Sequence, residues 1–211
     1  MLYFRTMEKV HPIEKVRLNH RKVPHADLPT RFGNFRIFGF ENDADGEVVA
    51  ALVKGKLDGE GVPLVRIHSQ CLTGDALHSL RCDCGEQLEE ALKRIQESSH
   101  GVLLYQMQEG RGIGLINKLF AYQLQDQGVD TVDANLRLGF EADSRSYEFC
   151  AEVLKYFGVS EIRLMSNNPH KVRSLEQEGI RILERVPLVV QASPHTARYL
   201  KTKKEKMGHL L

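Results

Sequence analysis

Apolar and polar residues alternate with a period of two in several short stretches, a pattern typical of β-strands. Phe35 and Ile37 alternate with polar neighbours, and Val48–Val53 is a continuous apolar run. Turn residues at 42–46 separate these two stretches and predict a hairpin-like connection between two strands. Further apolar runs predict strands at residues 64–69, 101–107, 161–165 and 180–184.

Other stretches repeat with a helical period. Leu88, Ala91, Leu92 and Ile95 recur at i, i+3, i+4 and i+7, which predicts a helix directly after Gly85. The same period predicts helices over about 115–125, on the stripe from 147 to 157, and ahead of Gly179. Strands that alternate with helices predict an α/β fold: a layered mixed β-sheet flanked by helices, with additional antiparallel strands at the N-terminal side.

The two ends of the chain follow neither period. Residues 1–30 contain Pro12, Pro24 and Pro29 and predict an irregular N-terminal arm. Residues 31–211 carry no repeat or linker that would divide them, so we expect one catalytic domain there. The tail from Pro194 contains the run KTKKEK, which predicts a surface helix or docked arm with its charges in solvent.

Composition narrows the range of partners. The 211 residues include 29 basic and 28 acidic side chains, a net charge of +1, which disfavours nucleic acid and membrane surfaces as partners. No apolar run approaches membrane-spanning length, and the first residues lack a secretory signal pattern. Four cysteines, three of them clustered, favour a reducing compartment, and we expect a cytoplasmic protein.

The clustered cysteines have the spacing C-x10-C-x-C at Cys71, Cys82 and Cys84. Three thiolates suit a soft metal ion such as zinc, whereas closed structural zinc sites use four protein ligands. Strand alternation places His68 on the face opposite Cys71, so we expect water as the fourth ligand. The alternative is a set of buried apolar cysteines; the neighbouring Arg81 disfavours it.

Two segments between a strand and a helix suit phosphate groups. The first, EGRGIGL at 109–115, combines glycines, helix-start amides and Arg111, although a plain glycine turn would look the same. In the second, SNNPHK at 166–171, Asn168 can cap a helix and Pro169 suits its first position. Lys171 then lies in the first turn, where a bound anion would offset its unfavourable interaction with the helix dipole. Together the segments predict a polyphosphate ligand.

The motifs RIHSQCLTGD, SLRCDCGEQL, EGRGIGL, DANLRLGFEADSR, SNNPHKV and ERVPLVV, followed by EKMGHLL, occur in this order. From about residue 28 to 211 the chain resembles the GTP cyclohydrolase II family of riboflavin biosynthesis. The resemblance implies a zinc-dependent hydrolase that converts GTP to formate, pyrophosphate and 2,5-diamino-6-ribosylamino-4(3H)-pyrimidinone 5′-phosphate. It also implies Mg2+ at the triphosphate and a homodimer.

The resemblance assigns residues as well. Zinc would be held by Cys71, Cys82 and Cys84. Asp143 would accept a proton, Arg145 would attack the α-phosphorus, and Tyr122 would serve full ring opening. GTP would be bound by Arg66, Ile67, His68, Ser69, Gln70, Gln87, Glu109, Gly110, Arg111, Thr131, Ser166 and Lys171.

Several alternatives stay open at this point. By sequence alone Asp143 is a plausible helix cap and Arg145 a solvated side chain. Because a guanidinium offers no lone pair, charge stabilisation by Arg145 is an easier role than nucleophilic attack. Gln70 stands where the family commonly has glutamate, and Ser166 where threonine is usual. A paralogue with a changed product or purine nucleotide, and a non-catalytic zinc and nucleotide-binding regulator, are the alternative functions.

Overall fold

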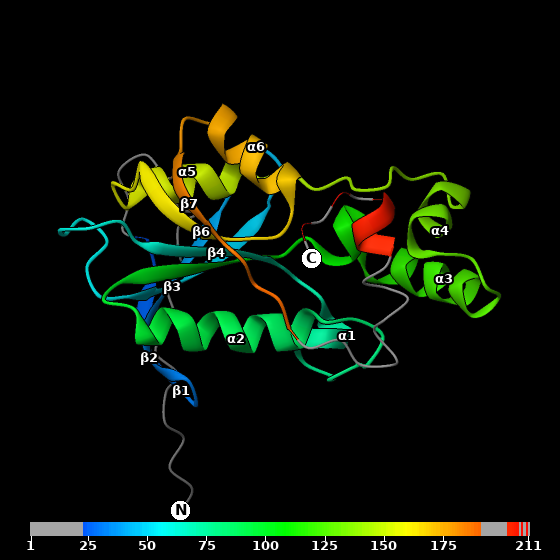
Figure 1. Ribbon diagram of the computed structural model, residues 1–211, viewed down its shortest axis with the longest axis horizontal. Helices are drawn as coiled ribbons and strands as arrows, with labels where there is room; N and C mark the ends of the chain where they lie inside the picture. Colours follow the sequence, from blue (N-terminus) through cyan, green and yellow to red (C-terminus); the bar gives the residue numbers. More distant parts are fainter. Residues whose placement is uncertain (1–22, 191–201, 207, 209, 211) are drawn as a thin grey trace, which may run out of the picture.

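The computed structural model describes residues 23–190, 202–206, 208 and 210. Its seven-stranded sheet has the order β1-β2-β3-β5-β4-β6-β7 (Figure 1). The pairs β1–β2, β2–β3 and β3–β5 are antiparallel, and the pairs β5–β4, β4–β6 and β6–β7 are parallel. This arrangement confirms the predicted mixed sheet. The strands are β1 (His25–Thr30), β2 (Gly33–Glu41), β3 (Val48–Lys54), β4 (Leu64–Ser69), β5 (Gly101–Gln106), β6 (Glu161–Met165) and β7 (Arg181–Val186).

One part of the predicted arm is regular. We expected residues 1–30 to be irregular, but β1 occupies His25–Thr30 and pairs along its length with β2. Pro29 is compatible with this strand because β1 lies at the edge of the sheet, where a missing amide donor is tolerated. Residues 1–22 of the arm lie outside the described residues.

Helices cover both faces of the sheet. On one face α2 packs Ala91 and Ile95 against Leu103 of β5, and on the other face α5 packs Cys150 against a core that includes Leu104 of β5. Adjacent residues of one strand therefore serve two cores, as the period of two requires. The helices are α1 (Leu72–Asp75), α2 (Cys84–Glu97), α3 (Gly114–Asp126), α4 (Thr131–Arg137), α5 (Glu148–Tyr156) and α6 (Pro169–Gln177), with a 3-10 turn η1 (Glu109–Gly112).

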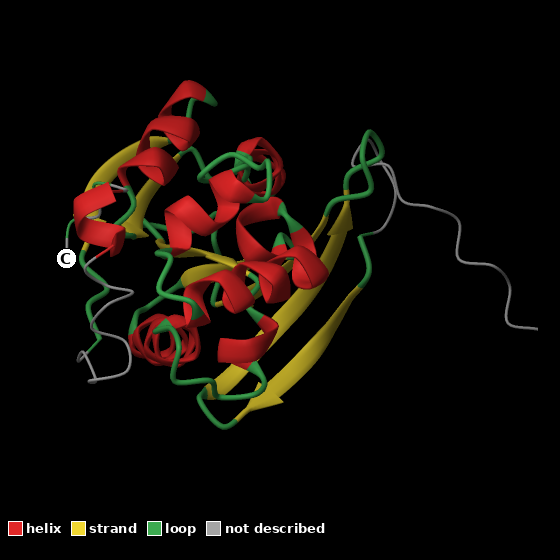
Figure 2. Cartoon of the chain, turned by 90° about the vertical axis from the view of Figure 1, so that its right-hand side faces the viewer, coloured by secondary structure: helices red, strands yellow, loops and turns green. Residues whose placement is uncertain are grey.

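The parallel strands bring three loops to one edge of the sheet. β4 leads to Cys71, β5 leads to Glu109 in η1, and β6 leads to Ser166. Carboxyl ends of parallel strands meet at the same edge, which is where open α/β sheets bind ligands. Helices α1, α3 and α4 lie beyond this edge in Figure 1, and Figure 2 views the molecule from there, with helices in front of the strands.

Candidate active site

A pocket opens at this edge of the sheet. All the predicted site residues line it except Ile67 and Asp143. The side chain of Ile67 is fully buried in the core, and its backbone carbonyl accepts a hydrogen bond from Lys171 Nζ at 2.8 Å. Asp143 reaches the pocket indirectly, because it binds Arg145, which lines the wall. Segments far apart in sequence thus meet here, as the motifs predict.

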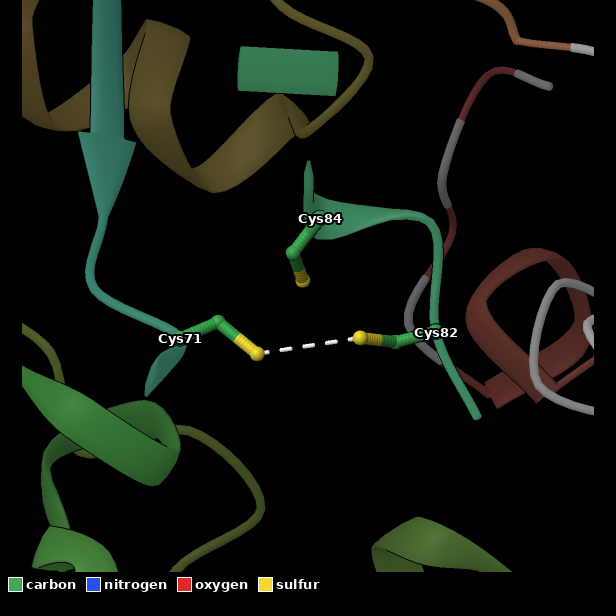
Figure 3. A group of neighbouring side chains, drawn as sticks. All are labelled: Cys71, Cys82 and Cys84. Carbon is green, nitrogen blue, oxygen red and sulfur yellow. Dashed lines mark hydrogen bonds between the residues drawn. The ribbon is translucent and has the colours of Figure 1, made fainter. Parts of the chain in front are cut away.

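Three sulfur atoms converge in this pocket (Figure 3). Those of Cys71, Cys82 and Cys84 all lie within 4.8 Å of one another, and Cys71 and Cys82 are 3.6 Å apart. Tetrahedral ligands at ~2.3 Å from a zinc ion would lie about 3.8 Å apart. Among the described residues, the group of His, Cys, Asp and Glu side chains at this point consists of these three cysteines. The donor set therefore fits a thiophilic metal with a further coordination position for another ligand.

Gly74 forms the floor beneath the sulfurs. A Cβ atom built at Gly74 would lie 3.0 Å from Cys82 Sγ and 3.2 Å from Cys71 Sγ. A Cβ atom at Gly85, in the first turn of α2, would lie 2.3 Å from the carbonyl oxygen of Gly74. Both glycines are therefore required for α1 and the start of α2 to approach closely enough to bring the cysteines together.

His68 lies in the pocket wall but does not join the cysteines. Its Nε2 is 3.0 Å from Asp75 Oδ1, and Asp75 also accepts hydrogen bonds from Tyr105 Oη and the Cys71 amide. Burial lowers the pKa of His68, and the hydrogen bond to Asp75 only partly opposes this effect. A neutral ring that donates from Nε2 leaves Nδ1 as a buried acceptor without a partner among the described residues.

Three cationic side chains also line the pocket: Arg66, Arg145 and Lys171. Arg66 Nη2 donates to Gln87 Oε1 at 2.7 Å, and burial lowers the pKa of Arg66 to about 10. Burial, and then the charges of Arg66 and Arg145, lower the pKa of Lys171 well below its usual value. Like charges held together in this way create a site that a bound anion would stabilise.

The second of the two predicted phosphate segments is built as expected at α6. The Oδ1 of Asn168 accepts a hydrogen bond from the His170 amide at 2.9 Å, and Pro169 is the first residue of the helix. Lys171 follows in the first turn. This arrangement confirms the capped helix start predicted from the sequence.

The first segment has a strained backbone. Gly110 and Arg111 both have a φ of 64°, a left-handed conformation that is costly for a residue with a side chain. Arg111 Nη2 is buried without a partner among the described residues. Strain combined with an unsatisfied cationic donor is typical of a ligand-binding loop and disfavours the plain-turn alternative.

Asp143 and Tyr122 have partners that sequence analysis alone did not provide. Burial would raise the pKa of Asp143, but hydrogen bonds and charge from Arg145 outweigh it and lower that pKa. The hydroxyl of Tyr122 lies 3.2 Å from Thr73 Oγ1, and the Arg81 guanidinium carbon lies 4.8 Å from the centre of the Tyr122 ring. These contacts hold Tyr122 in the pocket wall and Asp143 behind Arg145, which lines the wall.

The basic run near the C-terminus reaches the same pocket. Residues 202–206 are helical, and Lys203 Nζ is 2.6 Å from Asp83 Oδ1, between two of the cysteines in sequence. The prediction that this charge run is wholly solvated is wrong for Lys203, which is buried. The run of charged residues gave no signal for this contact, because Asp83 lies 120 positions earlier in the chain.

Comparison with known proteins fits this geometry. A sequence profile described as GTP cyclohydrolase II matches residues 20–187. The chain belongs to the GTP cyclohydrolase II family. GTP cyclohydrolase-2 of Proteus mirabilis (strain HI4320) is 55% identical over 191 residues, 90% of this chain and 96% of that protein. GTP cyclohydrolase-2 of Escherichia coli O45:K1 (strain S88 / ExPEC) is 56% identical over 191 residues, 90% of this chain and 97% of that protein.

The membership in the GTP cyclohydrolase II family confirms the resemblance stated from the motifs. A solved two-domain 3,4-dihydroxy-2-butanone 4-phosphate synthase from A. baumannii is also similar, at 17% identity and a TM-score of 0.44, over 81% of this chain and 42% of that one. That likeness is too distant to add to the fold described above. Within the described part of the chain, no helix has the length and apolar character needed to cross a membrane.

Proposed function

We propose that this protein opens the imidazole ring of GTP, the first step of riboflavin biosynthesis. The reaction would release formate and pyrophosphate and give 2,5-diamino-6-ribosylamino-4(3H)-pyrimidinone 5′-phosphate. One observation carries the proposal: a cluster of three sulfur atoms shares a pocket with the buried cations Arg66 and Lys171 and the partly buried Arg145. A soft-metal site beside an anion site suits a nucleotide triphosphate whose base is hydrolysed.

Cys71, Cys82 and Cys84 would hold one zinc ion. The sulfur separation and the close approach at Gly74 support this assignment, and zinc is the metal that the family resemblance implies. When bound, zinc would supply a Lewis acid at the base-binding end of the pocket. Mg2+ would accompany the triphosphate and share its charge with the protein's cations.

The chain's own side chains would bind and orient GTP. Arg66, Arg111 and Lys171 supply positive charge for the phosphates. Ile67 would act through its backbone, because its side chain lies in the core. The remaining contacts would come from His68, Ser69, Gln70, Gln87, Glu109, Gly110, Thr131 and Ser166, and all of these line the pocket.

Asp143 would accept a proton and Tyr122 would serve ring opening. For Arg145 we propose charge stabilisation at the α-phosphate in place of nucleophilic attack. A guanidinium stays protonated and has no free lone pair, whereas its fork of N–H donors matches phosphate oxygens. In the free protein Asp143 occupies two of these donors, Nε and Nη2, so a bound phosphate would compete with Asp143 for them.

A product assay tests the proposal. Incubation of the zinc-loaded protein with GTP and Mg2+ should release formate and pyrophosphate together, and absence of both would contradict it. Gln70 favours one alternative, a paralogue with a changed product, because a neutral amide replaces the family's usual carboxylate. Mass analysis separates the two, since a product that keeps the formyl group would show incomplete turnover.

We further propose a cytoplasmic homodimer that binds no nucleic acid. Cytoplasmic location is consistent with the free thiols of Cys71 and Cys82, which need reducing conditions. Helix α3 exposes Ile116, Leu119 and Phe120, an apolar surface that a second copy could bury. Light scattering on the purified protein would give twice the mass of one chain for a dimer.

A further inference from the structure

Lys118 is a buried cation in the pocket that neither the motifs nor the resemblance singled out. It lies in α3, faces the cysteines, and is only 8% exposed. Its Nζ donates a hydrogen bond to Cys71 Sγ at 3.2 Å. A lysine is rarely buried unless its charge has a specific partner, so this contact requires an explanation.

The second partner of Lys118 is Glu109, at 2.7 Å between Nζ and Oε1. Glu109 is itself fixed, because its carboxylate accepts hydrogen bonds from the amides of Leu72 and Gly110 at 2.7 and 2.8 Å. The ammonium group is therefore held in one place, between a carboxylate and a sulfur. The ion pair is neutral as a whole, but its positive end faces Cys71.

This placement has a chemical consequence for a thiolate ligand. Three thiolates around a divalent ion carry a net charge of −1, which makes the ion a weaker Lewis acid than nitrogen or water ligands would. An N–H donor at one sulfur withdraws electron density from it and orients its lone pairs. Such partners of metal ligands commonly set both the ligand's geometry and the metal's electronic character.

We propose that Lys118 is a positioning residue of the metal site. It holds Cys71 Sγ in ligand geometry and, through the N–H···S hydrogen bond, weakens the electron donation of that sulfur to the metal. The inference rests on the metal site of the proposed function. It assigns Lys118 to the metal rather than to the triphosphate, and the two roles have different kinetic and spectroscopic consequences.

The experiment uses the full-length protein loaded with Co2+ in place of zinc, which makes the sulfur-to-metal charge transfer visible by absorption. Removal of the donor in Lys118→Met should move this band to lower energy, because the sulfur becomes more electron-rich. Lys118→Arg keeps a charged N–H donor, so its band should lie close to that of the wild type. Lys171→Met is the matched control: it removes a pocket cation that contacts the Ile67 carbonyl, and its band should stay in place.

Steady-state kinetics of the zinc-loaded variants supply a second measurement. Lys118→Met should lower kcat by about 10- to 100-fold with little change in KM for GTP. A phosphate-binding lysine would instead raise KM. A raised KM with an unmoved charge-transfer band would therefore overturn the proposal.

Three further outcomes bear on the inference. If Lys118→Met does not fold, Lys118→Gln replaces the charged donor with a weaker, neutral N–H donor, and its band should lie at lower energy than that of the wild type. A band at the wild-type position in Lys118→Gln would contradict the proposed effect of Lys118 on the sulfur. Failure of the wild-type protein to take up cobalt or zinc would overturn the metal site itself and the inference with it. Metal uptake with an unshifted band in Lys118→Met overturns the inference alone.

Discussion

Arg145 donates two hydrogen bonds to the carboxylate of Asp143, with its Nε 2.7 Å from Oδ1 and its Nη2 2.5 Å from Oδ2. The guanidinium keeps the pKa of Asp143 low despite burial. An anionic carboxylate bound in this way is a weak base. If a phosphate group draws Arg145 away, the pKa of Asp143 rises and the carboxylate becomes a better proton acceptor, so substrate binding would itself activate the base.

Arg145→Lys tests this relationship, because it keeps a positive charge and removes the two-point contact. Burial then dominates and the pKa of Asp143 rises. The acid limb of the pH profile of kcat/KM should therefore move to higher pH, with a loss of about 10²-fold in rate at neutral pH. Asp143→Asn is the companion variant and should remove this limb altogether. A limb that stays in place in Arg145→Lys would show that Asp143 is not the group that titrates.

Ligand binding should also be linked to a proton at Lys171. Burial and the charges of Arg66 and Arg145 lower its pKa in the free protein, and a bound polyphosphate raises it. Between these two pKa values binding takes up a proton, so affinity should fall as the pH rises through this window. Calorimetry with inorganic triphosphate in buffers of different ionisation enthalpy measures the uptake, which we expect to approach one proton. Lys171→Met should abolish the buffer-dependent part; if it does not, another group takes up the proton.

The four cysteines should divide into two classes. Cys82→Ser should lose bound zinc and GTP turnover, because serine is a poor ligand for a soft site. Cys150 is fully buried in the core between α5 and the sheet, away from the pocket. Cys150→Ala should therefore keep bound zinc and GTP turnover and lose about 1 kcal/mol of unfolding free energy. Metal analysis, the product assay and chemical denaturation distinguish the classes. Full turnover in a zinc-free Cys82→Ser protein would disprove the assigned metal role.

Gly74→Ala should weaken metal binding without removing any ligand. The added methyl group would lie 3.0 Å from Cys82 Sγ, so the sulfurs must separate at a cost of about 1–3 kcal/mol. Competition with a chromogenic chelator measures the change in affinity. Gly59→Ala is the matched control, since its new Cβ atom would meet the Lys56 carbonyl at an ordinary 3.6 Å. Equal metal affinities in the two variants would show that the backbone at Gly74 can shift and accommodate the methyl group.

Local sequence patterns predicted the features of the fold that depend on residues close together in the chain. The period of two located the central strands, the helical period located α2 and α5, and Asn168 with Pro169 marked the start of α6. The cysteine spacing indicated a metal site because all three ligands come from one short segment. α4 was missed, although Asp130 caps it by accepting hydrogen bonds from the Val132 and Asp133 amides.

Local sequence patterns did not predict the contacts between segments that are far apart in the chain. Lys118 meets Cys71 across 47 positions, and nothing in the period of α3 separates this lysine from a solvated one. Asp143 and Arg145 are close in sequence, but only the family resemblance gave them roles. Their ion pair depends on a loop conformation that residue types alone do not determine.

The contact between Lys203 and Asp83 also makes one wall of the pocket depend on the far end of the chain. Both side chains are buried, and Lys203 lines the pocket. A chain cut short before Lys203 would leave the Asp83 carboxylate without its ammonium partner, in the turn between Cys82 and Cys84. A C-terminal truncation would therefore act on the cysteine cluster from 120 positions away in sequence.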